Sequence, residues 1–338
     1  MRKRIYGSLG LLSVFLAGAA TVILLATAQH QRAFASPSAV PEAVVSGAYK
    51  NPLQLALLYW YPANLTASFA VGNYPGGMAF DGANIWVTNT AGTTVTKILA
   101  SSGAIVASYP AGVQPYFVAF DGANIWVGQY YGGIVKLRAS DGAILGTFDV
   151  GSALAMAFDG ANIWAVSAFG NIVTKLHASD GTILGTYTVG DHPWGLAFDG
   201  GNIWVANWNS NTVSKLRASD GATLGTYETG YEPYAMAFDG SSIWVTIYGG
   251  GSVTKLRASD GVTLGTFAVG PCPDAIAFDG TNMWVANYGG SGNTVTKLRA
   301  WDGANLGTFN VGSGAVGVAF DGANIWVTNF FDGTVSKL

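Results

Sequence analysis

The chain has 338 residues, of which 50% are hydrophobic and only 10% are charged, and its formal net charge at pH 7 is −3. The basic residues are dispersed along the chain and form no patch, so nucleic acid is not an expected partner. Cys272 is the only cysteine, which excludes an intrachain disulfide framework and a thiolate metal cluster, so stability must come from packing.

Residues 1–35 are predicted to be an export segment. Arg2-Lys3-Arg4 precedes the uncharged, largely apolar stretch Ile5–Ala28, and small-x-small cleavage sites occur at Ala33-Phe34-Ala35 and Ala26-Thr27-Ala28. The apolar stretch also reaches the roughly 20 residues that span a bilayer, so a cleaved signal peptide and an uncleaved membrane anchor are both open. Either alternative places the rest of the chain outside the cytoplasm, in the periplasm, the cell envelope or the medium. Without this segment, 12 Lys and Arg face 19 Asp and Glu, a formal charge of −7.

Residues 36–63 are predicted to be a linker followed by a short apolar element. Asn51-Pro52 supplies a helix N-cap with proline at the first helical position, so we expect one or two helical turns there. We expect this element to pack beside the domain that follows and not to contact a membrane.

From residue 64 onward the sequence is repetitive. The phrase Ala-Phe-Asp-Gly occurs seven times, its aspartates are 38 to 42 residues apart, and each is followed five positions later by tryptophan. A period near forty indicates one supersecondary unit repeated in tandem. The seven Asp/Trp pairs are Asp81/Trp86, Asp121/Trp126, Asp159/Trp164, Asp199/Trp204, Asp239/Trp244, Asp279/Trp284 and Asp321/Trp326.

Each repeat is predicted to hold four antiparallel strands, which is the content of one propeller blade. The Asp-Gly dipeptide between the first two strands is typical of a type I′ hairpin turn, in which both central residues have positive φ. In one repeat the strands are expected at Gly195–Phe198, Asn202–Asn207, Thr212–Arg217 and Thr223–Thr229.

The two ends of the repeat region predict how the ring closes. The seventh copy holds only three strands before the chain stops, and the segment Asn64–Gly72 aligns with the fourth strand of another copy, Ala222–Gly230. The N-terminal strand should therefore complete the last blade and leave no open edge. We predict that residues 64–338 form a monomeric, seven-bladed β-propeller of four-stranded antiparallel blades.

The repeat resembles the YVTN family of bacterial β-propellers. The family tetrapeptide stands here as Trp86-Val87-Thr88-Asn89 and Trp326-Val327-Thr328-Asn329, and Thr212-Val213-Ser214-Lys215-Leu216 matches the strand that follows it. The resemblance covers residues 64–338 and implies the propeller fold. Related propellers include NHL-repeat interaction modules, streptogramin lyases and quinone-dependent dehydrogenases, so the resemblance does not specify an activity.

Residues that recur in every repeat are interpreted as scaffold. The aspartates are expected to bond the backbone of their own turns, and the tryptophans to form the core. The lysines and arginines of the third strands, such as Lys215 and Arg217, are expected at a solvated or snorkelling position. His177 occupies the arginine position of its repeat and is interpreted as a surface substitution.

Residues that vary between repeats are the candidates for a specific function. The rim that carries the blade-to-blade connections and the loops between second and third strands is rich in tyrosine and tryptophan, which are typical of recognition surfaces. The position five residues before the repeated aspartate is Trp194, Tyr234 or Asp274 in three consecutive repeats, but Gly76, Leu154 or Val316 in three of the others. The predicted ligand-binding residues are Tyr116, Tyr130, Asp191, His192, Trp194, Trp208, Tyr231, Glu232, Tyr234 and Asp274.

Two functions remain open, and the first is favoured. It is a non-catalytic, exported propeller that binds a glycan, a peptide or an envelope protein through the aromatic rim, with no cofactor and no metal. The second is an enzyme similar to streptogramin lyases, which use His and Glu with a divalent cation to open a cyclic depsipeptide. Its only acid–base candidates are His192, Glu228 and Glu232, so the resemblance carries over no catalytic residue securely. A quinone-dependent dehydrogenase ranks third, because such propellers usually have eight blades.

Overall fold

The computed structural model describes residues 67–289 and 293–338. The export segment predicted at 1–35 and the linker and apolar element predicted at 36–63 lie outside this range. Within the described residues, no helix has the length and apolar character needed to cross a bilayer.

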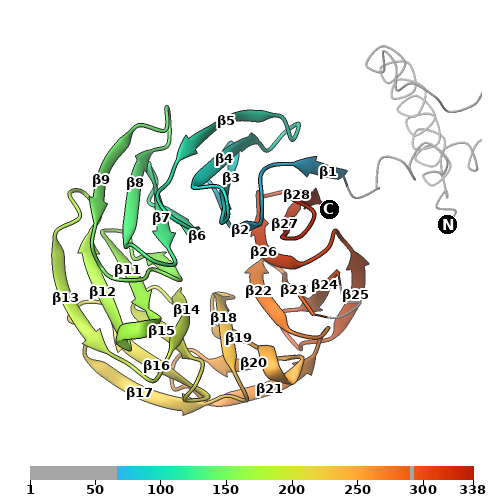
Figure 1. Cartoon of the computed structure of the whole chain (residues 1–338). Coiled ribbons are helices and arrows are strands. Elements are labelled where there is room, and N and C mark those ends of the chain that lie inside the picture. Colours follow the sequence, from blue (N-terminus) through green and yellow to red (C-terminus); the bar gives the residue numbers. More distant parts are fainter. Residues whose placement is uncertain (1–66, 290–292) are drawn as a thin grey trace, which may run out of the picture. The chain divides into compact units, whose positions relative to one another are not determined.

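Seven four-stranded antiparallel sheets surround a central channel (Figure 1). The prediction of a seven-bladed β-propeller is confirmed. Blade 1 consists of β2 (Pro75–Phe80), β3 (Asn84–Asn89), β4 (Thr94–Leu99) and β5 (Ile105–Pro110). Blade 2 consists of β6 (Pro115–Phe120), β7 (Asn124–Gln129), β8 (Ile134–Arg138) and β9 (Ile144–Phe148). Blade 3 consists of β10 (Met156–Phe158), β11 (Asn162–Ser167), the 3-10 turn η1 (Ala168–Gly170), β12 (Ile172–His177) and β13 (Ile183–Thr188).

The later blades repeat the same arrangement. Blades 4 to 7 are β14 (Pro193–Phe198), β15 (Asn202–Asn207), β16 (Thr212–Arg217) and β17 (Thr223–Glu228); β18 (Pro233–Phe238), β19 (Ser242–Ile247), the 3-10 turn η2 (Tyr248–Gly250), β20 (Ser252–Arg257) and β21 (Thr263–Ala268); β22 (Pro273–Phe278), β23 (Asn282–Asn287), β24 (Thr294–Arg299) and β25 (Asn305–Asn310); and β26 (Ala315–Phe320), β27 (Ile325–Asn329), β28 (Thr334–Lys337) and β1 (Ala67–Ala70).

The ring is closed by the first strand, as predicted. β1 pairs antiparallel with β28, so that Phe69 lies opposite Val335, and the two ends of the propeller share one sheet (Figure 1). The Phe69 ring also packs on Trp326, with ring centroids 5.7 Å apart. The last blade therefore has the same four strands as the others, and β28 is paired on both sides.

The repeated aspartate organises the first hairpin of each blade. In blade 4 the Asp199 Oδ1 atom accepts the backbone N–H groups of Gly201 at 2.9 Å and Asn202 at 2.7 Å, while Oδ2 accepts the Trp204 indole N–H at 2.8 Å. The structural role assigned to this aspartate is confirmed. The predicted type I′ turn is wrong, because the loop has three residues and only Gly200 has a positive φ, of 97°.

These aspartates should make the fold sensitive to acid. Burial alone would raise the pKa of Asp199, but its hydrogen bonds from Trp204, Asn202 and the backbone outweigh burial and lower the pKa below the usual 3.8. The pKa is lowered in the same way in all seven repeats. A carboxylate with a depressed folded-state pKa contributes stability above its unfolded-state pKa and loses it as the pH falls through the folded-state value.

We therefore expect the urea midpoint to be steady from pH 7 to about 5 and to fall steeply below the unfolded-state aspartate pKa of about 3.9. Asp199→Asn should reduce this pH dependence, because the amide cannot be protonated in that range. Asp149→Asn is the control, since Asp149 makes a single 3.2 Å bond to the Gly151 backbone. A urea midpoint that stays constant down to pH 3 would contradict this role.

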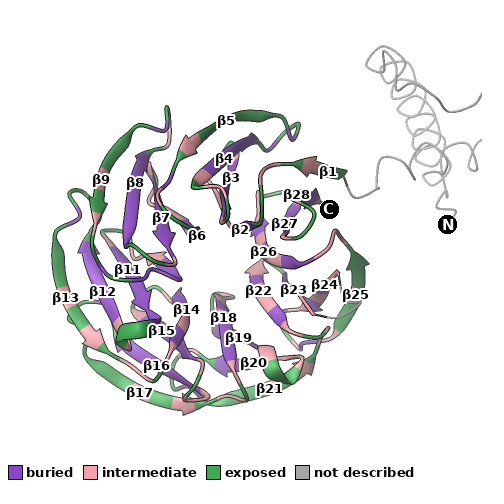
Figure 2. Cartoon of the chain, viewed as in Figure 1, coloured by how far each residue is buried: buried purple, intermediate pink, exposed green. Residues whose placement is uncertain are grey.

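Among the described residues, a lysine of the third strand donates a hydrogen bond to the next blade in six of the seven blades. Lys215 lies with its Nζ atom 4.9 Å from the centre of the Trp204 ring and donates to the carbonyl oxygens of Ala258 at 2.6 Å and Ser259 at 3.2 Å in blade 5. The predicted solvated or snorkelling position is wrong for Lys215, which is buried, and Figure 2 shows that its strand, β16, is mostly buried. It is correct for Arg217, which is exposed and pairs with Asp220 in its own turn.

Lys215→Met should lower the free energy of unfolding by about 1–3 kcal/mol, because it leaves a carbonyl at the blade interface without its donor. Arg217→Met is the matched control on the same strand, and its loss of an exposed ion pair should cost about 0–1 kcal/mol. Urea unfolding of both variants measures the difference. Equal costs would show that the lysine does not hold the blades together.

Candidate functional site

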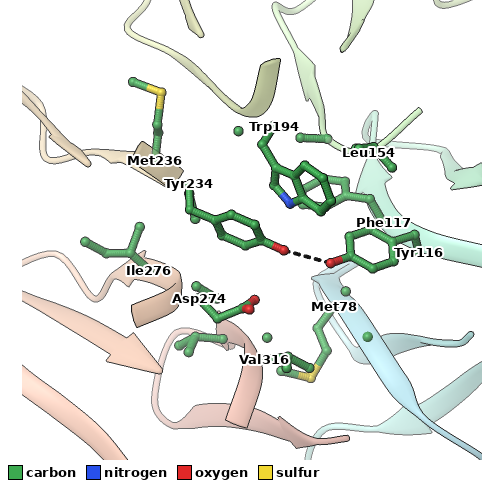
Figure 3. A pocket seen from close by; sticks show the side chains of 18 of the residues that line it. Met78, Tyr116, Phe117, Leu154, Trp194, Tyr234, Met236, Asp274, Ile276 and Val316 are labelled. Carbon is green, nitrogen blue, oxygen red and sulfur yellow. Dashed lines mark hydrogen bonds between the residues drawn. The ribbon is translucent and has the colours of Figure 1, made fainter. Parts of the chain in front are cut away.

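A cavity of about 170 Å³ lies in the central channel. The inner strands β2, β6, β10, β14, β18, β22 and β26 contact one another in sequence around the ring and form its wall. Each blade contributes the residue that stands five positions before the repeated aspartate, and these seven residues surround the cavity (Figure 3). They are Gly76, Tyr116, Leu154, Trp194, Tyr234, Asp274 and Val316.

Small residues next to this ring allow the inner strands to approach closely. A Cβ atom at Gly195 would overlap the carbonyl oxygen of Tyr234 on the next inner strand, and one at Gly317 would lie 2.6 Å from the Gly76 carbonyl oxygen. Only glycine fits at such contacts. The close packing leaves the larger side chains of the preceding positions directed into the channel (Figure 3).

Three aromatic residues form one side of the cavity. The Trp194 and Tyr234 rings stack with centroids 5.1 Å apart, and Tyr116 meets Trp194 edge-on at 6.2 Å. The hydroxyl groups of Tyr116 and Tyr234 share a hydrogen bond of 2.8 Å across the cavity (Figure 3). Aromatic pairs in these geometries contribute about 0.5–1.5 kcal/mol beyond their burial, so this wall is rigid.

The same aromatic packing extends outward to the rim. Trp208 packs on Trp194 at 6.0 Å and on Tyr248 at 5.1 Å, while Tyr131 and Phe169 stack at 6.0 Å with nearly parallel rings. We call this group the aromatic cluster. Its members, drawn from blades 2 to 5, are Tyr116, Tyr130, Tyr131, Phe169, His192, Trp194, Trp208, Tyr234 and Tyr248.

A strained connection holds the outer rings against the inner ones. His192 adopts a left-handed conformation with a φ of 52°, and its backbone N–H donates to the Asn171 side chain at 2.9 Å. Its carbonyl oxygen accepts the backbone N–H of Trp208 at 3.0 Å, which fixes that hairpin loop beside Trp194. Glu232 has the same conformation, and its carbonyl oxygen accepts the backbone N–H of Tyr248 at 2.9 Å. Tyr74, Gln114 and Cys272 have a positive φ at the same position of other connections, so this conformation belongs to the repeated scaffold.

Asp274 is the acidic residue of the cavity. Its side chain is partly accessible from the cavity, and its carboxylate makes no hydrogen bond or ion pair with any residue that the structure describes. Burial raises the pKa of Asp274 well above its usual range. Burial and the nearby Asp274 charge also raise the pKa of Tyr116 and Tyr234. The cavity therefore holds a carboxyl group that burial disfavours in its charged form.

The structure brings most of the predicted ligand-binding residues together. Six of them belong to the aromatic cluster, and Asp274 faces the cavity below it. The six are Tyr116, Tyr130, His192, Trp194, Trp208 and Tyr234.

The remaining predicted residues lie apart from the cavity. Asp191 is exposed at the rim and accepts hydrogen bonds from the side chains of Asn171 and Asn209. Tyr231 is 61% exposed, and its pKa is raised by the adjacent Glu232 carboxylate. Glu228 is exposed on the outermost strand β17.

No hydrogen bond or ion pair joins His192 to Glu228 or Glu232 among the residues described. Nor does any group of three His, Cys, Asp or Glu side chains in that part of the chain have a geometry able to hold a metal ion.

Several residues of the cavity wall were missed in the sequence, and Met78 and Phe117 are two of them. Met78 and Phe117 line the cavity from β2 and β6 (Figure 3). Both stand in inner strands where every residue is apolar or small, so no local pattern separates channel-facing positions from core positions. Only the distance to the repeated aspartate, compared between repeats, could have identified them.

Comparison with known proteins establishes the fold class. No protein-family model matches the sequence, and no curated protein matches it significantly. Among solved structures, a streptogramin B lyase superposes with a TM-score of 0.67 at 18% identity, covering 81% of this chain and 96% of that one. A hydrazine synthase of Kuenenia stuttgartiensis superposes with a TM-score of 0.68 at 15% identity, covering 78% and 95%. At these identities the similarity shows a β-propeller; the YVTN resemblance stays a prediction.

Proposed function

We propose that this chain is an exported, non-catalytic binding protein, which takes its ligand at the aromatic cluster above the central cavity. The ligand would be a glycan, a peptide or part of an envelope protein. The single observation that carries the proposal is the contiguous packing of aromatic rings from four blades around a cavity. Rigid Tyr and Trp side chains provide large contact areas at a small cost in conformational entropy.

The polar groups near the cluster support binding more than catalysis. The Asp191 carboxylate is engaged by two asparagine side chains, and His192 lies against Phe169 and Trp194 with ring centroids at 6.0 and 5.4 Å. A general base needs to be within about 2.6–3.2 Å of the proton that it removes, and is usually oriented by a third group. His192 is positioned as part of an aromatic surface, where its backbone orders the neighbouring loop.

The alternative is an enzyme that opens a cyclic depsipeptide, and the propeller fold supports it as well as it supports the binding proposal. The enzyme would require His192 and a divalent cation. The two proposals are therefore separated by one pair of variants, Trp194→Ala and His192→Ala.

A thermal-shift screen of the purified full-length protein tests the proposal. The panel consists of glycans, cell-wall fragments, peptides and cyclic depsipeptides, each with and without Mg²⁺. A ligand at 100 times its Kd stabilises the folded state by about 2.7 kcal/mol, which a melting curve detects. We expect a hit that Mg²⁺ does not affect and that His192→Ala retains. Turnover of a depsipeptide that needs Mg²⁺ and His192 would contradict the binding proposal, as would a panel without any hit.

A further inference from the structure

The central cavity combines one carboxyl group with aromatic walls. Asp274 is the only residue with an acidic or basic side chain on its lining, and no lysine, arginine or histidine lies among the described residues that form the wall. Trp194, Tyr234 and Tyr116 face it from blades 4, 5 and 2 (Figure 3). A charged carboxylate in such a site requires a partner, which the protein does not supply.

We propose that the cavity binds the ammonium group of an organic cation, between the carboxylate of Asp274 and the face of the Tyr234 ring that Trp194 leaves uncovered. The inference rests on the proposed binding function and specifies the charged group of its ligand. The face of an aromatic ring attracts a cation within about 6 Å of its centroid, and tryptophan does so most strongly. The Tyr234 ring, backed by Trp194 on its other face, thus provides a cation-binding surface, and Asp274 provides the opposite charge.

The donor set favours an organic cation over a metal ion. The side-chain oxygen atoms that the lining offers are those of the Asp274 carboxylate and the hydroxyls of Tyr116 and Tyr234, and the two hydroxyls are joined to each other at 2.8 Å. Calcium takes about 6–8 oxygen ligands, and magnesium about six in strict octahedral geometry. The remaining wall is formed by Met78, Leu154 and similar apolar residues, which suit alkyl groups attached to nitrogen.

The size of the cavity limits how much of the ligand enters. A cavity of about 150 Å³ accommodates a molecule the size of benzene, and the cavity here is of similar volume. An alkylammonium or trimethylammonium group fits such a space. The rest of a larger ligand would lie on the aromatic cluster at the rim.

Binding should be coupled to the release of a proton. The pKa of Asp274 is raised by burial, and the titratable groups that its charge affects are Tyr116, Tyr234, Tyr248 and Tyr288, while Cys272 lies beside Tyr248. A bound cation favours the ionised carboxylate. The affinity should therefore increase with pH, by up to about tenfold per unit, until the pH exceeds the pKa of Asp274 in the empty protein.

Calorimetric titration of the full-length protein tests the inference with matched probes. Choline and its neutral carbon isostere 3,3-dimethylbutan-1-ol differ in charge and hardly in shape, and butylammonium tests a primary amine. We expect choline or butylammonium to bind at least tenfold more tightly than the neutral alcohol at pH 8. The preferred cation shows whether the site takes a quaternary or a primary ammonium group.

Asp274→Asn should remove both the preference for the cation and the increase of affinity with pH. Its melting temperature should not fall, because the variant replaces a carboxyl group that has no described partner by a neutral amide of the same size. Asp149→Asn is the control, because it removes one negative charge outside the cavity. If the Asp274→Asn variant is less stable, the increase of affinity with pH in the unaltered protein still tests the inference.

If neither choline nor butylammonium binds more tightly than the neutral alcohol, the inference is overturned and the proposed binding function is left intact. Failure of both ammonium probes to bind at 10 mM would also overturn it. The thermal-shift panel then shows separately whether the binding function fails too.

Discussion

Trp204→Ala is expected to lower the free energy of unfolding by about 3–5 kcal/mol. The indole is fully buried, donates to Asp199 at 2.8 Å, stacks on Tyr227 at 5.6 Å and lies beneath the Lys215 ammonium group. Truncation removes all of these contacts at once and leaves a cavity between blades 4 and 5. Urea unfolding at pH 7 measures the effect.

Trp301→Ala is the matched control for this prediction. Trp301 stands in a turn between β24 and β25, is 73% exposed and contacts Arg299. Surface substitutions of this kind usually change stability by about 0.5 kcal/mol or less. If both tryptophan variants lost the same stability, the recurring indole would not be the core of the blade.

Trp194→Ala is expected to weaken ligand binding by about 30-fold or more, corresponding to a central interface residue that contributes about 2 kcal/mol. Trp194 lines the cavity and contacts Tyr116, His192, Trp208 and Tyr234, so its removal takes away the centre of the aromatic cluster. Its ring is only half-buried, so the loss of stability should be smaller than for Trp204→Ala.

The affinity is measured by calorimetry with the ligand that the thermal-shift panel identifies, and Trp301→Ala again serves as the control. His192→Ala should weaken binding less than Trp194→Ala, because His192 lies at the periphery of the cluster. Unchanged affinity in Trp194→Ala would remove the aromatic cluster from the binding site.

Much of the fold follows from the repetition in the sequence. The spacing of the aspartates determines seven blades, and the alignment of Asn64–Gly72 with a fourth strand predicts the pairing of β1 with β28. The turn type and the lysines were predicted wrongly for physical reasons. The aspartate side chain caps a three-residue loop, so Gly200 alone needs a positive φ. Lys215 is buried because its ammonium group donates a hydrogen bond to a carbonyl of the next blade, a contact that leaves no trace in the local sequence.

The candidate site is partly visible in the sequence. Comparing the residue five positions before each repeated aspartate identifies the ring around the cavity, because equivalent positions in a closed propeller face the same axis. The hydrogen bond between Tyr116 and Tyr234 and the isolation of Asp274 are not visible there. They depend on the channel radius and on which blades face each other across it, and these are properties of the assembled ring.

A crystal structure of the protein with the ligand that the screen identifies tests the central claim most directly. We predict ligand density in the central cavity, in contact with Trp194 and Tyr234, with the cationic group of the ligand beside Asp274. Density confined to the opposite rim, among the repeated Asp-Gly turns, would contradict it.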